Sequence, residues 1–151
     1  MRYIEEILQP GEQVLFAGTL HWIVYLPAML ILIPAVGALT QARPGTTGMS
    51  WLLAAIAFLL ASAVMSASAW FRRWTTEIDV TNRRIVYETG FIRRHTVEMN
   101  MDKVESVDVD QSFWGRILDY GDIVIRGTGV GIEPLHNIGS PLAFRNKVTA
   151  G

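Results

Sequence analysis

The chain contains two long stretches without Asp, Glu, Lys or Arg, the first over residues 13–42 and the second over residues 44–71. A helix needs about 20 apolar residues to cross hydrocarbon about 30 Å thick, and each stretch is longer than that. A globular chain of 151 residues rarely buries two successive helices that both lack a polar face. The sequence therefore predicts a transmembrane hairpin over 22–71, with helices over 22–42 and 50–71.

The ends of these helices predict the orientation of the hairpin. Arg72 and Arg73 follow the second helix directly, whereas the loop between the helices has Arg43 alone. Basic residues remain on the cytoplasmic side, so we expect both termini in the cytoplasm and a short outer turn. Aromatic side chains, which favour the headgroup level, mark the expected boundaries at Trp22, Tyr25, Trp51, Trp70, Phe71 and Trp74.

Charge and cysteine content exclude several classes of partner. The net charge is −1, and from Trp74 onward nine Lys or Arg stand against eleven Asp or Glu. Nucleic-acid binding needs a basic face that releases counterions, so no nucleic-acid partner is expected. The chain has no cysteine, which excludes a disulfide and a thiolate metal site.

After Arg73 the sequence changes to the alternation typical of half-buried strands. Ile78 and Val80 alternate with Glu77 and Asp79, and similar short runs follow up to Ile138. Residues 111–119 interrupt the alternation as a short helical or irregular connection. Ser140 before Pro141 is typical of a helix start, which predicts a closing helix through Val148. Residues 72–151 are thus predicted to form a small domain of about six antiparallel strands capped by a helix.

The N-terminal segment over residues 1–21 is predicted to be cytoplasmic as well. Val14, Phe16 and Gly18 alternate with neighbours of the other face, so Glu12–Gly18 is a candidate for an additional strand. A domain of about 75 residues has a marginal core, and a strand recruited from before the membrane would enlarge it.

Three segments resemble a known family. Thr75–Gly90 is similar to the opening strand hairpin of the bacterial pleckstrin-homology (PH) domain found in small membrane proteins. Val104–Ile125 matches that family more specifically, with Gln111-Ser112, Arg116-Ile117-Leu118 and Tyr120-Gly121 placed between two strands. Leu8–Glu12 and the hairpin before the domain also agree, so the resemblance covers nearly the whole chain.

The resemblance implies an α+β membrane protein in the bacterial cytoplasmic (inner) membrane. Its parts would be a two-helix transmembrane hairpin and a small antiparallel PH-like β-barrel or sandwich, capped by a C-terminal helix and placed on the cytoplasmic face. The family carries no catalytic motif, so an enzyme is not expected. Because the PH fold serves lipid, peptide and protein recognition alike, fold alone does not decide the function.

Two hypotheses for the function follow. The first is a membrane-anchored interaction or scaffold module that binds an unknown protein partner or copies of itself. The alternative is a domain that binds anionic lipid through arginines near the membrane, each worth about 1 kcal/mol beside anionic headgroups. The candidate lipid-facing residues are Arg72, Arg73, Arg83, Arg84, Arg93 and Arg94.

Self-association is expected from small and aromatic residues. The second span repeats small residues at four-residue spacing, which lets helices approach closely. The connection after residue 110 adds large apolar side chains, including Ile117 and Leu118, that either cap the domain core or contact a neighbour. The candidate oligomer contacts are Ala61, Ser62, Ala63, Phe113 and Trp114.

No metal, cofactor or catalytic site is expected. The three histidines, His21, His95 and His136, have no carboxylate at metal-ligand spacing. Asp108 and Asp110 alternate with valines, as residues on a solvated strand face do. Gly127-Thr128-Gly129 lacks the lysine and helix of a phosphate loop and predicts a strand hairpin instead.

Overall fold

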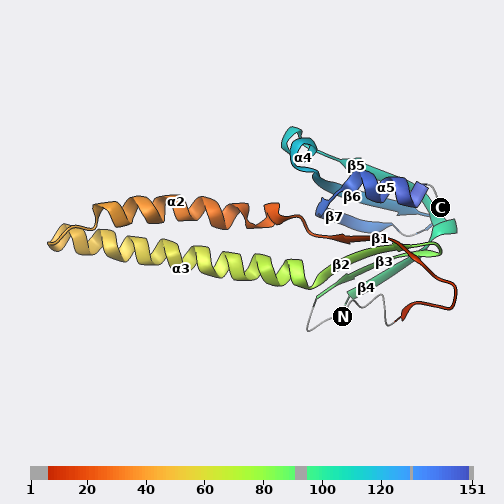
Figure 1. Ribbon diagram of the computed structural model, residues 1–151, viewed down its shortest axis with the longest axis horizontal. Helices are drawn as coiled ribbons and strands as arrows, with labels where there is room; N and C mark the ends of the chain where they lie inside the picture. Colours follow the sequence, from red (N-terminus) through yellow and green to blue (C-terminus); the bar gives the residue numbers. More distant parts are fainter. Residues whose placement is uncertain (1–6, 91–94, 130, 150–151) are drawn as a thin grey trace. The chain divides into compact units, whose positions relative to one another are not determined.

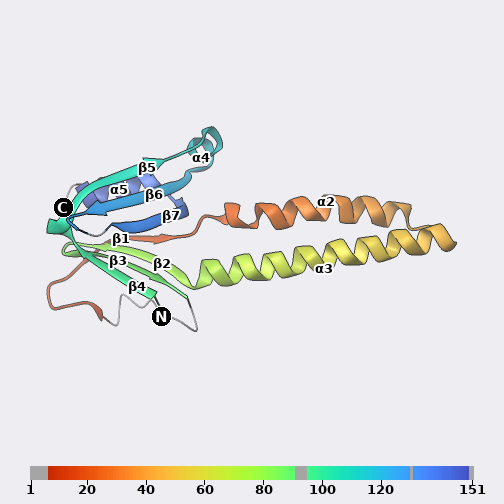
Figure 2. The same ribbon diagram turned by 180° about the vertical axis from the view of Figure 1, so that it is seen from behind.

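The computed structural model describes residues 7–90, 95–129 and 131–149, which divide into two compact units. One unit holds residues 22–73, and the other combines residues 1–21 with residues 74–151. The second unit is therefore discontinuous in sequence, with the first inserted into it. Figures 1 and 2 show the two units from opposite sides.

The inserted unit is a helical hairpin. A short 3-10 helix η1 (Trp22–Tyr25) leads into α2 (Leu26–Gln41), and α3 (Thr46–Trp74) returns beside it (Figure 1). The segment Trp22–Gln41, which is η1 and α2 together, and the segment Thr47–Trp74 of α3 are long and apolar enough to cross a membrane by length and composition. Pro34 lies inside α2 and removes one backbone donor there.

Small residues line the contact between α2 and α3. On α3 the buried positions recur every seven residues, at Gly48, Ala55, Ser62 and Ala69, and on α2 they are Ala28, Ala35 and Ala38. Seven residues make nearly two helical turns, so these positions share one stripe. The Ser62 hydroxyl donates to the Ala28 carbonyl at 2.9 Å. The two helices therefore pack through backbone proximity rather than through large side chains.

The discontinuous unit contains two antiparallel sheets. The first has the order β1 (Val14–Thr19), β2 (Thr76–Thr81), β3 (Arg84–Thr89) and β4 (His95–Asn100). The second has the order β5 (Val104–Asp110), β6 (Tyr120–Gly127) and β7 (Ile132–Gly139). The 3-10 helix η2 (Met101–Lys103) connects the sheets, and a bridge between Leu20 and Ile138 joins their far edges.

The core lies between the two sheets and under α5 (Pro141–Thr149). Phe144 of α5 is fully buried, and its ring meets Phe16 of β1 edge-to-face at 5.7 Å. The other fully buried side chains are mainly inward-facing isoleucines: Ile78, Ile85, Ile123, Ile125 and Ile138. Because β1 contributes Phe16, residues before the hairpin help to complete the core.

The α+β class predicted from alternation is confirmed. The expected strands lie within a few residues of β2 to β7, and Glu12–Gly18, the candidate strand, corresponds to β1. Two details differ. Asp79, expected on a solvated face, is 3% exposed because β2 is an inner strand of its sheet. Ser140 precedes α5 as predicted, but its hydroxyl donates to Asp119 at 2.5 Å.

Candidate functional site

The connection between β5 and β6 forms a rigid platform around the short helix α4 (Phe113–Leu118). Ser112 caps the helix by accepting from the Gly115 N–H at 3.1 Å. Asp119 ends it in the left-handed conformation, with a φ of 58°. Gln111 Nε2 donates to the carbonyls of Gly115 at 3.3 Å and Tyr120 at 3.0 Å, which ties the start of the connection to its end.

Two glycines allow the platform to lie close against the sheet. A Cβ on Gly115 would stand 2.6 Å from the Tyr120 carbonyl oxygen, and a Cβ on Gly121 would stand 2.6 Å from the Asp110 carbonyl oxygen. Both obstacles are backbone atoms, which cannot move aside as a side chain can. The Gln-Ser and Tyr-Gly pairs of this segment thus have a structural purpose: they hold α4 in place.

The outer face of α4 is apolar and exposed. Phe113 is 71% exposed, Trp114 64% and Ile117 59%, and we call these three side chains the α4 apolar face. The rings of Phe113 and Trp114 meet edge-to-face at 5.6 Å. Large apolar side chains that gather this way on a surface mark sites of interaction. The sequence left open whether they cap the core, and the structure places them outside it.

The C-terminal end of α4 lies beside the residue from which the chain enters η1. The ring of Tyr120, two residues after α4, stacks on His21 with centroids 5.2 Å apart. The His21 N–H donates to the Asn137 carbonyl at 2.7 Å, and Leu20 bridges to Ile138. The platform and residues 20–21, which precede η1 in the chain, therefore lie at the same end of this unit.

A buried ion pair fastens the N-terminal segment to the turn between β2 and β3. Arg84 Nε lies 3.0 Å from Glu12 Oε1, and Arg84 Nη1 lies 2.8 Å from Glu98 Oε2. The Glu12 side chain is fully buried, and it also accepts from the Thr81 hydroxyl at 2.8 Å and from the Gln9 N–H at 2.9 Å. We call this cluster the Glu12–Arg84 clasp.

The clasp shifts the pKa values of both partners. Burial raises the pKa of Glu12, but hydrogen bonds from Gln9, Thr81 and Arg84 outweigh it and leave the pKa below the ordinary value. The hydrogen bond with Glu12 raises the pKa of Arg84, more than burial lowers it. Both groups therefore stay charged at neutral pH, and their charges offset each other.

The candidate lipid-facing arginines differ in their exposure and in their partners. Arg72 and Arg73 are exposed in the last turn of α3. Arg83 is exposed at the turn after β2, at the opposite end of that strand from the hairpin junction. Arg84 at the same turn forms ion pairs with Glu12 and Glu98, so its charge is already used within the unit. Arg93 and Arg94 lie outside the described residues.

The candidate oligomer contacts on α3 also differ in their burial. Ser62 is 3% exposed and bonded to α2, whereas Ala61 and Ala63 on either side of it are exposed. Ser62 thus serves the hairpin itself. Ala61 and Ala63 remain available to another helix.

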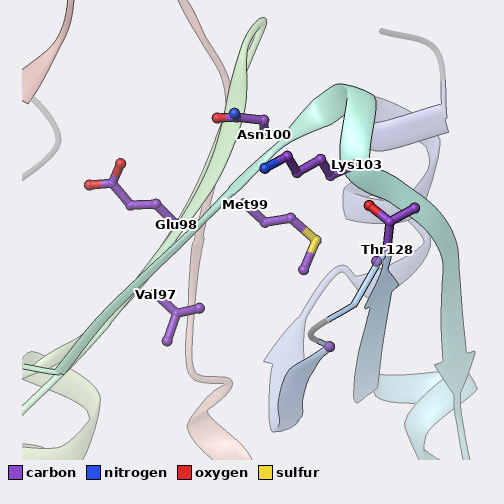
Figure 3. A pocket seen from close by; sticks show the side chains of 8 residues that line it. Val97, Glu98, Met99, Asn100, Lys103 and Thr128 are labelled. Atoms are coloured by element: carbon purple, nitrogen blue, oxygen red, sulfur yellow. The ribbon is translucent and has the colours of Figure 1, made fainter.

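A small cavity of about 230 Å³ lies between β4 and the β6–β7 turn (Figure 3). Its polar lining comprises Lys103, Asn100, Thr128 and Glu98, of which Glu98 is bonded to Arg84. Sites for small organic ligands usually occupy about 300–1,000 Å³. The cavity is below that range and offers a single cation, so it is a weak candidate for ligand binding.

The three histidines have different surroundings, and one of them pairs with a carboxylate. His21 stacks on Tyr120, His136 Nδ1 lies 2.8 Å from Asp122 Oδ2, and His95 is exposed at the start of β4. Asp108 pairs with Arg126 at 3.1 Å on the surface. Within the described ranges no three His, Asp or Glu residues gather as metal ligands do.

The sequence did not reveal the Glu12–Arg84 clasp. Its only local signal is an acidic residue at the start of the candidate strand Glu12–Gly18, and the partner is 72 residues away. The stacking of His21 on Tyr120 joins residues still farther apart in sequence, so neither contact follows from periodicity.

Comparison with known proteins is consistent with this architecture. A family model described as the bacterial PH domain matches residues 21–150. The match begins after β1 and includes the hairpin, both sheets from β2 onward and the α4 platform. No curated protein and no solved structure matches the chain significantly.

Proposed function

Because this chain belongs to the bacterial PH-domain family, we propose that it is a membrane-anchored interaction module of the bacterial inner membrane. In this proposal the hairpin spans the bilayer with both termini in the cytoplasm. The PH-like unit then binds a protein partner, or further copies of this chain, and performs no catalysis.

The observation that carries the proposal is the exposure of the hairpin. Only 17% of the most apolar window of either helix is buried, although both windows are as apolar as membrane spans. The core helix of a water-soluble protein would be mostly covered by the rest of its chain. Exposed large side chains such as Ile33, Leu60 and Val64 need an apolar solvent, and lipid supplies one.

Self-association is supported by small residues of α3 that lie outside its contact with α2. The stripe through Ser62 is used by α2, while Ala61 and Ala63 are exposed on either side of it. Close helix approach in lipid depends on such small residues, because burial from water contributes nothing there. A cyclic homo-oligomer would use one of these two flanks or both.

The lipid-binding alternative has less support. Arg72 and Arg73 are the exposed pair beside the hairpin junction, whereas Arg84 is neutralised by Glu12 and Glu98. From Trp74 onward acidic residues outnumber basic ones. A domain that reads anionic headgroups needs a concentrated cationic surface. We therefore favour protein recognition.

Single cysteines test the anchoring and its orientation, because the chain has none of its own. Thr47→Cys lies in the first turn of α3, next to the connection between the helices, and Arg126→Cys lies on an exposed end of β6. We expect an impermeant thiol reagent to label Thr47→Cys in intact cells, and Arg126→Cys only after the membrane is opened. Labelling of both in intact cells would rule out the proposed topology, and labelling of neither before lysis would rule out an outer turn.

A further inference from the structure

The α4 apolar face has no cover within the part of the chain that the structure describes. Phe113, Trp114 and Ile117 are each more than half exposed, while Gly115 on the same short helix is buried against the sheet. The platform is rigid, because backbone contacts and the Gln111 and Ser112 side chains fix it. A rigid helix that presents three large apolar side chains to water requires an occupant for that face.

The position of α4 in the unit indicates what contacts this face. Tyr120 directly follows the α4 cap and stacks on His21, and Trp22 begins η1 immediately after His21. Gly139, the partner of Tyr120 across the β6–β7 ladder, lies against Thr19 and His21. The same end of the unit thus carries both α4 and the residues that lead into the hairpin. If the hairpin crosses the bilayer, this end cannot be far from the membrane surface.

The chemistry of the face suits the boundary between headgroups and acyl chains. Tryptophan and phenylalanine concentrate at this boundary, and a cation beside them can meet phosphate. Arg116 is exposed on the same helix, whereas Asp110 and Asp119 are exposed at its two ends. The two carboxylates stay in water, so they limit insertion to the outermost side chains.

A second copy of the chain fits this face less well. Large aromatic side chains bury roughly 150–250 Å² each, so three apolar side chains of at most this size stay below the roughly 800 Å² per partner of a stable protein interface. A helix of six residues is only about 9 Å long. Lipid needs no such minimum area once the chain is already anchored, because the anchor keeps the local concentration high.

We propose that the α4 apolar face inserts shallowly into the lipid interface as a third membrane contact, which holds the PH-like unit in one orientation on the bilayer. The inference rests on the proposed membrane anchoring. A third contact from a different part of the chain fixes which surface faces the cytoplasm.

Spin labels on single cysteines of the full-length protein test the proposal. Ile117→Cys reports the α4 face, Leu60→Cys is the reference inside the proposed second span, and Arg126→Cys is the water-exposed reference. The protein is placed as one copy per nanodisc of phosphatidylcholine. Collision with oxygen, which concentrates in lipid, is then compared with collision with a water-soluble nickel chelate.

We expect the ratio of oxygen to nickel collisions at Ile117→Cys to lie severalfold above Arg126→Cys and below Leu60→Cys. A ratio equal to that at Arg126→Cys would overturn the lipid contact while Leu60→Cys still confirms the anchor. Protection of Ile117→Cys from both reagents would show that protein, and not lipid, covers the face. If that protection appeared only in nanodiscs with several copies of the chain, the cover would be a second copy. If Leu60→Cys itself behaves as water-exposed, the membrane anchoring fails and the inference fails with it.

Discussion

Replacing Glu12 by Gln should loosen the N-terminal strand from the PH-like unit. The substitution keeps the shape of the side chain and removes the charge that faces Arg84. Two contacts of 3.0 and 3.1 Å between the guanidinium and the carboxylate lose their ionic component. One of the two oxygens, which accept from Thr81 and from Gln9, is replaced by an NH2 group that cannot accept. Removing one partner of a buried pair costs about 3–5 kcal/mol when the other charge is left alone.

The expected cost here is smaller, because Arg84 retains other partners. Its Nη1 stays 2.8 Å from Glu98, its Nη2 donates to the Ile7 carbonyl, and the side chain is 13% exposed. We therefore expect a loss of about 2 kcal/mol in the free energy of opening β1, which corresponds to about thirtyfold faster amide exchange in that strand. Hydrogen exchange of the full-length protein in micelles, read by mass spectrometry on peptides covering β1, measures this quantity.

The pH dependence provides a second check on the same residue. The pKa of Glu12 in the folded chain is below its ordinary value of 4.5, so the carboxylate stabilises β1 above that pH. This stabilisation is lost as the pH falls through the folded-state pKa. Protection of β1 in the wild type, corrected for intrinsic exchange, should decline below about pH 4.5, and the decline should be weaker in Glu12→Gln.

A matched control separates the clasp from a general effect of removing a carboxylate. Glu105→Gln changes an exposed residue of β5 and should leave β1 exchange within about 0.5 kcal/mol of the wild type. Equal exchange in Glu12→Gln and the wild type would refute the reasoning. So would additive effects of Glu12→Gln and Arg84→Met, since two groups in direct contact must show coupling.

Two further substitutions probe the hairpin and the platform. Ser62→Leu places a large side chain in the contact between α2 and α3, so it should reduce the thermal stability of the hairpin in detergent. Ala61→Leu should leave that stability unchanged and should weaken the oligomer seen by native mass spectrometry. Unchanged thermal stability of Ser62→Leu would contradict the contact through Ser62. Gly121→Ala puts a methyl group against the Asp110 carbonyl, which should cost at least about 1 kcal/mol. Proteolysis between β5 and β6 should therefore become at least about fivefold faster. An unchanged cleavage rate would show that the platform tolerates the added methyl group.

Periodicity was sufficient to predict the elements of this fold but not the contacts that fasten them. Alternation from Ile78 onward located the strands, since inward residues must be apolar when one face packs on a core. The seam between α2 and α3 was less accessible. Small residues recur on α3 at both four and seven positions, and only the seven-residue set through Ser62 faces α2.

The α4 apolar face was also predicted only in part, because local spacing does not show which side chains are exposed. A sequence shows that Phe113 and Trp114 interrupt a strand pattern, but exposure depends on which side of the sheet the connection crosses. Arginine doublets look alike in sequence, yet Arg84 meets two carboxylates that precede and follow it by 72 and 14 residues. Such long-range pairing depends on the folded arrangement and not on local spacing.

The insertion of the hairpin between β1 and β2 has a consequence for how the protein is made. The ribosome completes β1 long before its partner strand, so Val14–Thr19 must wait until both apolar helices have been synthesised. Closing a flexible connection of about 55 residues would cost roughly 3.5 kcal/mol in chain entropy. Two antiparallel helices remove most of that cost, because they return the chain to the place it left, where Thr19 meets Glu77. If the hairpin spans the membrane as proposed, insertion of the two helices must come before β1 can pair with β2. If the helices did not insert, β2 would remain an unpaired edge strand. Such an edge can pair with other chains, so the protein would be prone to aggregation.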